Sequence, residues 1–128
     1  MNMLNYAHDY ISGDIDKDKA NELAAISSEV FIEDSWTGII KEGAFEGITN
    51  LVLLNTNRIT GIEDGAFKGC VRLEKLVIPD VEQVGDDVFE GCVNLKEVVV
   101  RDDNMVQIII NKLIGCALDI GKIDVHHV

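Results

Sequence analysis

The sequence contains few aromatic residues, few basic residues and few cysteines. Aromatic residues make up only 5% of the chain, although hydrophobic residues make up 47%. The core is therefore expected to consist mainly of aliphatic side chains, as in a stack of parallel strands. At 128 residues the chain has the length of one domain.

Basic residues are outnumbered by acidic residues, 11 to 23, which gives the chain a net charge of −12. Nucleic acids and anionic membranes attract basic surfaces, so neither is expected to bind this chain directly. The charge itself favours a protein partner with a basic surface. It also helps to keep a repeat protein soluble.

The three cysteines, Cys70, Cys92 and Cys116, each follow a glycine and occupy equivalent repeat positions. An odd number within a core argues against a disulfide framework and for a reducing compartment. Residues 1–6 have neither a basic segment nor a long apolar run, so no signal peptide is expected, and no stretch has the length of a membrane span. We therefore predict a cytoplasmic location, which is the host cell cytoplasm if the chain is phage-encoded.

No metal site and no cofactor are predicted. The cysteines would lie in a straight file, one strand spacing of about 4.8 Å apart, whereas zinc needs four converging ligands. The acidic segment 14–18 starts like a calcium-binding loop, but Lys19 and Ala25 stand where such a loop needs Gly and Glu.

No catalytic residue is predicted either, and the chain is not expected to be an enzyme. His8, His126 and His127 have no spacing that suggests a catalytic pair, and adjacent residues of a strand point to opposite faces. No motif in the sequence indicates a nucleophile paired with a general base.

One five-residue phrase occurs three times, as Gly-Ala-Phe-Glu-Gly, Gly-Ala-Phe-Lys-Gly and Asp-Val-Phe-Glu-Gly. Its phenylalanines, Phe45, Phe67 and Phe89, stand 22 residues apart. Such a period predicts stacked, nearly identical units, each burying its apolar face against the next. The phenylalanines are expected to form a buried column, and Asp64 and Asp86 to cap the turns that carry them.

The segments 73–79, 81–85 and 89–92 read L-x-x-L-x-I-P, V-x-x-V-G and F-x-G-C. They resemble the BspA-type leucine-rich repeat, and the resemblance is strong over residues 36–100. It implies an α/β repeat solenoid that forms a short arc. A parallel sheet of about four or five strands would line the concave side, short helical turns the convex side, and a helical cap the N-terminus. It also implies a role in recognising other proteins.

We predict a single domain, 1–128, with three parts. Residues 1–28 form the N-terminal helical cap, with Tyr6, Tyr10 and Ile11 on one short helix. A second helix through 20–26 begins at Asp14 or Asp16. Residues 29–103 form the repeats. Residues 104–128 form an irregular last repeat, with a helix at about 104–116 and a final strand at 122–125.

Alternation along the strands predicts which side chains leave the concave sheet. Leu53, Val77 and Val99 are expected to form an exposed apolar strip, with Lys122 beside Glu97 and Asp124 beside Val99 in the final strand. The main hypothesis is a non-enzymatic protein-binding module that uses this face and the acidic surface. Its candidate residues are Leu53, Asn55, Lys75, Val77, Glu97, Val99 and Arg101.

Two alternatives remain open. The acidic residues could make the chain a nucleic-acid mimic that blocks the basic channel of a host nuclease, as a phage anti-defence or anti-CRISPR inhibitor does. The residues concerned are Asp64, Asp80, Glu82, Asp86, Asp87, Asp102 and Asp103. The chain could also be a structural subunit or a homodimer that pairs through its C-terminal edge strand. Only residues 126–128 would cover the open end of the stack there.

Overall fold

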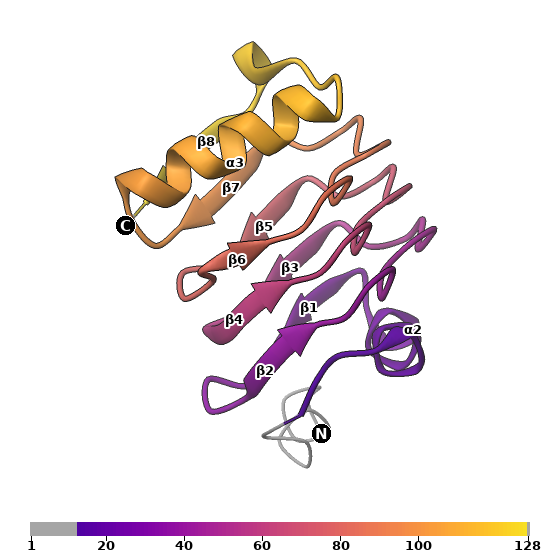
Figure 1. Cartoon of the computed structure of the whole chain (residues 1–128). Helices are drawn as coiled ribbons and strands as arrows, with labels where there is room; N and C mark the ends of the chain where they lie inside the picture. The colour runs from indigo at the N-terminus through magenta and orange to yellow at the C-terminus, as the bar shows by residue number, and fades with distance from the viewer. Residues whose placement is uncertain (1–12, 128) are drawn as a thin grey trace.

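The computed structural model describes residues 13–127, whose strands stack in two parallel sheets (Figure 1). The expected helix face of Tyr6, Tyr10 and Ile11 lies outside the described residues. The five-stranded sheet has the order β1-β3-β5-β7-β8. It consists of β1 (Glu29–Phe31), β3 (Leu53–Asn55), β5 (Lys75–Val77), β7 (Glu97–Val100) and β8 (Asp124–His127). The stack of coils is the solenoid that the repeat predicted.

A second sheet lies on the other side of the core, and the sequence did not predict it. Its three parallel strands have the order β2-β4-β6 (Figure 1). They are β2 (Thr37–Ile40), β4 (Arg58–Ile62) and β6 (Gln83–Val84). Each coil of the stack therefore contributes one strand to each sheet over the regular repeats.

The core is mainly aliphatic, and its largest aromatic feature is the column of phenylalanines. Phe45, Phe67 and Phe89 are fully buried. Their rings stack with centroids 5.4 Å and 6.5 Å apart. The expected buried column is confirmed.

The Gly-Ala-Phe segments are hydrogen-bonded turns and not helices. Gly43 and Gly65 open two of them with φ of 61° and 63°, a left-handed conformation that costs glycine little. Asp87 takes the same conformation in the third copy, with φ of 57°. The turns also bond to one another between coils, since the Phe45 amide donates to the Ala66 carbonyl at 2.8 Å.

The N-terminal end of the stack is covered by α2 (Lys17–Ile26). Of the two expected caps the structure selects Asp16, whose carboxylate accepts a hydrogen bond from the Lys19 amide at 2.9 Å. The helix buries Leu23 and its alanine neighbours against the first coil. Trp36 is also buried there, and its indole nitrogen donates to the Gly13 carbonyl at 2.9 Å.

The C-terminal end differs from the prediction in two ways. The helix α3 (Asp103–Gly115) continues the row of β2, β4 and β6, and it packs against β8 (Figure 1). Its buried residues Met105, Ile109 and Leu113 close the core, so the end of the stack is not left to residues 126–128 alone. The 3-10 helix η1 (Ile120–Lys122) then occupies the place where the final strand was expected to begin.

The insertion of η1 moves the register of β8 by two residues. Asp124 lies opposite Glu97, and His126 lies opposite Val99. The predicted neighbours, Lys122 beside Glu97 and Asp124 beside Val99, are therefore wrong. The physical reason is that three residues are used in a helical turn, which makes the last coil longer than the repeat.

Candidate protein interface

The outer face of the five-stranded sheet, which we call the sheet face, carries two lanes of side chains set by the strand register. Leu54, Leu76 and Val98 point into the core, so their neighbours in sequence point outward. The first lane consists of Glu29, Leu53, Lys75, Glu97 and Asp124. The second lane consists of Phe31, Asn55, Val77, Val99 and His126.

The predicted exposed strip is wrong at one of its three positions. Leu53 and Val77 are half-buried on the sheet face, but Val99 is only 5% exposed. The shifted register places His126 beside Val99, and the His126 ring reaches Glu97, with Nε2 and Oε2 2.7 Å apart. His126 is therefore the strand neighbour of Val99 and bonds to Glu97 on the same face.

Phe31 is the residue of the sheet face that the sequence analysis missed. It stands in register with Asn55, and 48% of its surface is exposed, although a phenylalanine is usually buried. A pocket of about 320 Å³ adjoins it, lined by Phe31, Ile32, Glu33, Asp34 and Asn55. The available signal was that apolar residues flank Phe31 on both sides, which sends a strand residue between them outward.

Ion pairs connect the strands along the first lane. Lys75 Nζ lies 3.5 Å from Glu97 Oε1, and the second oxygen of Glu97 holds His126. The hydrogen bond between Glu97 and His126 lowers the pKa of the Glu97 carboxyl and raises the pKa of His126. These contacts fix the side chains at the C-terminal half of the sheet face.

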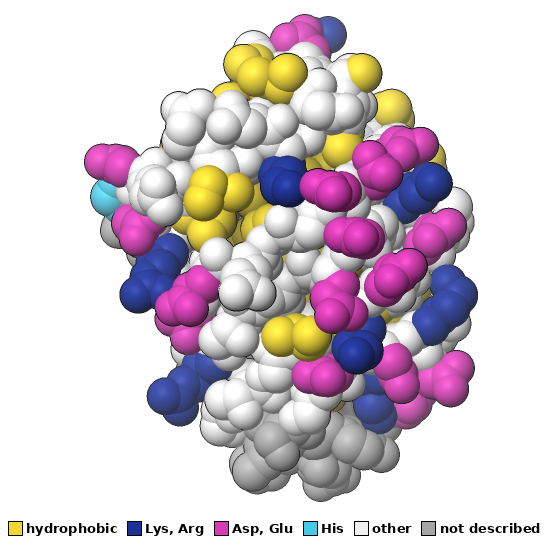
Figure 2. All heavy atoms as spheres, in the orientation of Figure 1, with side chains coloured by type: hydrophobic (Ala, Val, Ile, Leu, Met, Phe, Trp, Pro, Cys, Tyr) yellow, Lys and Arg dark blue, Asp and Glu magenta, His cyan; other side chains and the backbone are white. Residues whose placement is uncertain are grey.

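The acidic set of the alternative hypothesis is divided between the two ends of β6. Asp64, Asp86 and Asp87 lie on the loops beyond β4 and β6, where Figure 2 shows acidic side chains gathered along one side of the molecule. At the other end of β6, Arg101 contacts Glu82 and Asp102 and lies near Asp80. Its hydrogen bond with Glu82 raises the pKa of Arg101.

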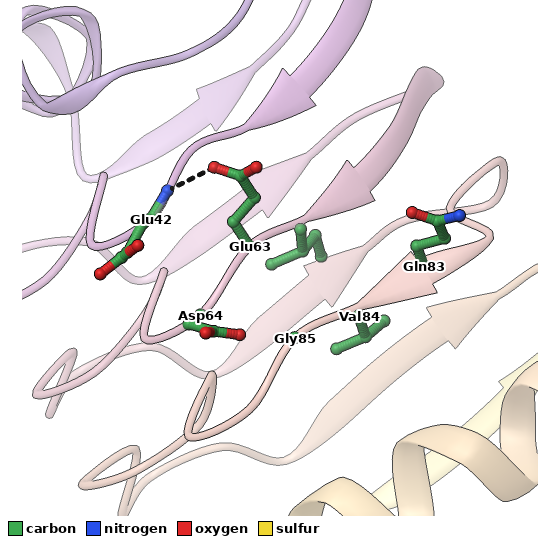
Figure 3. Close-up of a pocket in the computed structure, with 7 residues that line it drawn as sticks. Glu42, Glu63, Asp64, Gln83, Val84 and Gly85 are labelled. Carbon is green, nitrogen blue, oxygen red and sulfur yellow. Dashed lines mark hydrogen bonds between the residues drawn. The ribbon is translucent and has the colours of Figure 1, made fainter.

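Asp64 does not cap its own turn as predicted. Its Oδ1 accepts a hydrogen bond from the Asp86 amide of the next coil at 2.8 Å. Glu63 reaches in the opposite direction and accepts from the Glu42 amide at 3.0 Å (Figure 3). These two acidic residues therefore join three successive coils.

Gly85 makes this arrangement possible. It lines a shallow pocket of about 300 Å³ beside Asp64 (Figure 3). A Cβ at Gly85 would lie 2.3 Å from Asp64 Oδ1 and 2.6 Å from the Asp64 amide nitrogen. The close approach of the two coils therefore requires a glycine.

Most of the other candidate acidic residues also have structural contacts. Asp86 pairs with Lys112 at 3.0 Å. Asp102 is the N-cap of α3 and accepts from the Met105 amide, and Asp103 lies 3.0 Å from His127. These carboxylates are therefore engaged within the fold.

The cysteines act as internal hydrogen-bond donors. The Cys70 thiol donates to the Phe45 carbonyl at 3.0 Å, and the Cys92 thiol donates to the Phe67 carbonyl at 3.1 Å. Burial raises the pKa of both thiols to about 12. Cys116 is half-buried, and partial burial raises its pKa as well. All three are free thiols.

Residues 21–126 match the family described as BspA type leucine rich repeat region, in six copies. The match spans most of the chain, so the chain belongs to this family, as the repeat phrase predicted. Leucine-rich repeat proteins of this kind are generally non-enzymatic scaffolds that bind other proteins. No curated protein and no solved structure matches the chain. Among the described residues, neither helix is long and apolar enough to traverse a lipid bilayer.

Proposed function

We propose that this chain binds another protein through the sheet face, with Phe31 as the central contact. The observation that carries the proposal is the exposed aromatic ring beside a pocket. Aromatic residues next to a pocket supply a large share of the binding energy in many protein interfaces. Leu53 and Val77 add half-buried apolar side chains to the same face, and Asn55 adds a polar one beside the ring.

The partner is expected to present a basic surface around an apolar group. Glu29, Glu33 and Asp34 surround Phe31, and the whole chain carries a net charge of −12. Complementary charges accelerate association and help to orient the two proteins. The remaining candidates Lys75, Glu97 and Arg101 belong to the rim of this interface, whereas Val99 belongs to its buried floor.

A reducing compartment is part of the proposal. Three free cysteines, two of them buried as hydrogen-bond donors, fit a protein that works in the cytoplasm, or in the host cytoplasm if a phage encodes it. The proposed binding role is non-enzymatic.

The test is a capture experiment with two variants that each remove one exposed apolar side chain. Phe31→Ser removes the proposed contact, and Val93→Ser removes a side chain that is 69% exposed outside the five-stranded sheet. A protein from the source cell's lysate should be retained by the natural chain and by Val93→Ser, and lost with Phe31→Ser. Retention that is equal for all three chains would contradict the proposal.

The nucleic-acid mimic remains an alternative hypothesis, motivated by the acidic side chains that gather along one side of the molecule. It predicts that the captured protein is a nuclease or another nucleic-acid-binding protein. It also predicts that DNA or RNA displaces the chain and that binding falls steeply with salt. Displacement by nucleic acid together with full binding by Phe31→Ser would favour this alternative over the sheet face.

Pairing of two chains through β8 also remains a prediction. Light scattering coupled to size-exclusion chromatography distinguishes a monomer from a dimer. A strict monomer at high concentration would remove this alternative.

A further inference from the structure

Three side chains that commonly bind metals converge on the C-terminal part of the sheet face. Glu97 and Asp124 lie directly opposite each other on β7 and β8, and His126 lies two residues beyond Asp124 on the same face. One possible ligand atom from each residue lies within 4.8 Å of the other two. The shifted register of β8 creates this group, which the sequence analysis did not foresee.

The distances within the group suit one small ion. His126 Nε2 lies 2.7 Å from Glu97 Oε2 and 3.9 Å from Asp124 Oδ2. A zinc ion binds nitrogen and carboxylate oxygen at about 2.0–2.2 Å, which sets tetrahedral ligands about 3.3–3.5 Å apart. The His126–Glu97 distance would therefore have to increase slightly, and the His126–Asp124 distance would have to decrease slightly, to reach the spacing of zinc ligands.

We propose that Glu97, Asp124 and His126 form a binding site for one divalent transition-metal ion of the zinc class. An imidazole together with carboxylates favours zinc, cobalt or nickel over calcium and magnesium, which prefer oxygen ligands alone. Three protein ligands leave a fourth position open on the outer face of the sheet.

The surroundings of the group support this assignment. Val99, only 5% exposed, lies in register with His126 and gives the site an apolar floor. Lys75 contacts Oε1 of Glu97, whereas Oε2 faces His126 and is the oxygen that would bind the ion in place of its hydrogen bond with the ring. With the His126 imidazole neutral, the form that binds a metal, the two carboxylates and the Lys75 ammonium leave a net negative charge, which attracts a divalent cation.

The test is calorimetric titration of zinc chloride into the full chain under reducing conditions. We expect one ion per chain, bound through the three residues. Glu97→Gln, Asp124→Asn and His126→Gln should each weaken binding at least about tenfold, the scale on which even indirect supports of a metal site act. Asp124 is 73% exposed, so Asp124→Asn gives a variant whose folding is not at risk.

Two variants provide matched controls. His127 follows His126 in sequence but contacts Asp103 on α3, and Cys116 is a half-buried thiol elsewhere in the fold. His127→Gln and Cys116→Ser should change the zinc affinity by no more than about twofold. This change is well below the loss of about tenfold expected for the three ligand variants. Thermal unfolding should show a zinc-dependent rise in Tm in both controls and none in His126→Gln.

Several results would overturn the proposal. These are the absence of zinc binding, binding that survives all three ligand substitutions, and binding of magnesium as tight as that of zinc. The titration contains no protein partner, so its result is independent of whether the sheet face binds another protein.

Discussion

Phe45, Phe67 and Phe89 hold the stack together at the scale of single residues. Each ring is fully buried and stacks on the ring of the next coil. Phe67 is the central ring and contacts both others. The repeat phrase thus has a structural role, and the proposed binding uses residues that lie outside the core.

Replacing Phe67 with alanine should lower the free energy of unfolding by about 3–5 kcal/mol, because the cavity interrupts the column. That loss is a large part of the stability of a typical domain, about 5–15 kcal/mol. Urea denaturation followed by Trp36 fluorescence measures it. A loss below about 1 kcal/mol would show that the column does not stabilise the stack.

The three cysteines should differ in reactivity. Burial raises the pKa of Cys70 and Cys92 to about 12, so at pH 8 they carry almost no thiolate, the form that reacts. Cys116 is half-buried and accessible from a pocket of about 480 Å³. Iodoacetamide should therefore label Cys116 first in the native protein, as mass spectrometry would show. Equal labelling of all three cysteines would contradict the burial of Cys70 and Cys92.

Two residues show the limit of reading single side chains from the sequence. Strand alternation predicted that the Val99 side chain points outward from the sheet and is exposed. It does point outward, but it is only 5% exposed. Its neighbour on β8, His126, comes from 27 positions further along the chain. Phe31 was missed because an exposed phenylalanine departs from the usual burial of its type.

At the scale of elements, the repeat predicts the five-stranded sheet and α3, and the capping residues Asp14 and Asp16 predict α2, but neither predicts the second sheet. Apolar residues spaced by 22 positions fix where each coil returns to its strand. The strands β2 and β4 each contain a glycine, Gly38 and Gly61, a residue that is depleted in strands, so these segments looked like returning loops. The register of β8 depends on η1, a local turn that no spacing encodes.

The contact between the loops of β4 and β6 makes a prediction about Gly85. Gly85→Ala should destabilise the protein by about 1–3 kcal/mol, because the new Cβ would overlap Asp64 and separate two coils. Gly115→Ala is the control, since a Cβ there meets no atom within 4 Å. Denaturant titration of both variants measures the difference. If Gly85→Ala were as stable as Gly115→Ala, the two coils would have adjusted to the new Cβ without loss of stability, which would contradict the prediction.

At the scale of the whole molecule, the solenoid separates stability from binding. The phenylalanine column lies in the core, and the backbone hydrogen bonds of both sheets join successive coils. The outward side chains of the sheet face, among them the exposed ring of Phe31, take no part in these backbone bonds. The proposed recognition through the sheet face would therefore leave the phenylalanine column and the backbone hydrogen bonds of the coils undisturbed.

The affinity of the captured partner for matched variants tests the central claim most directly. Isothermal titration should show that Phe31→Ser weakens binding by at least about 30-fold, since central aromatic contacts typically contribute 2 kcal/mol or more. Val93→Ser should bind like the natural chain, and circular dichroism should show both variants folded. Unchanged affinity of Phe31→Ser, or a comparable loss with Val93→Ser, would contradict recognition through the sheet face.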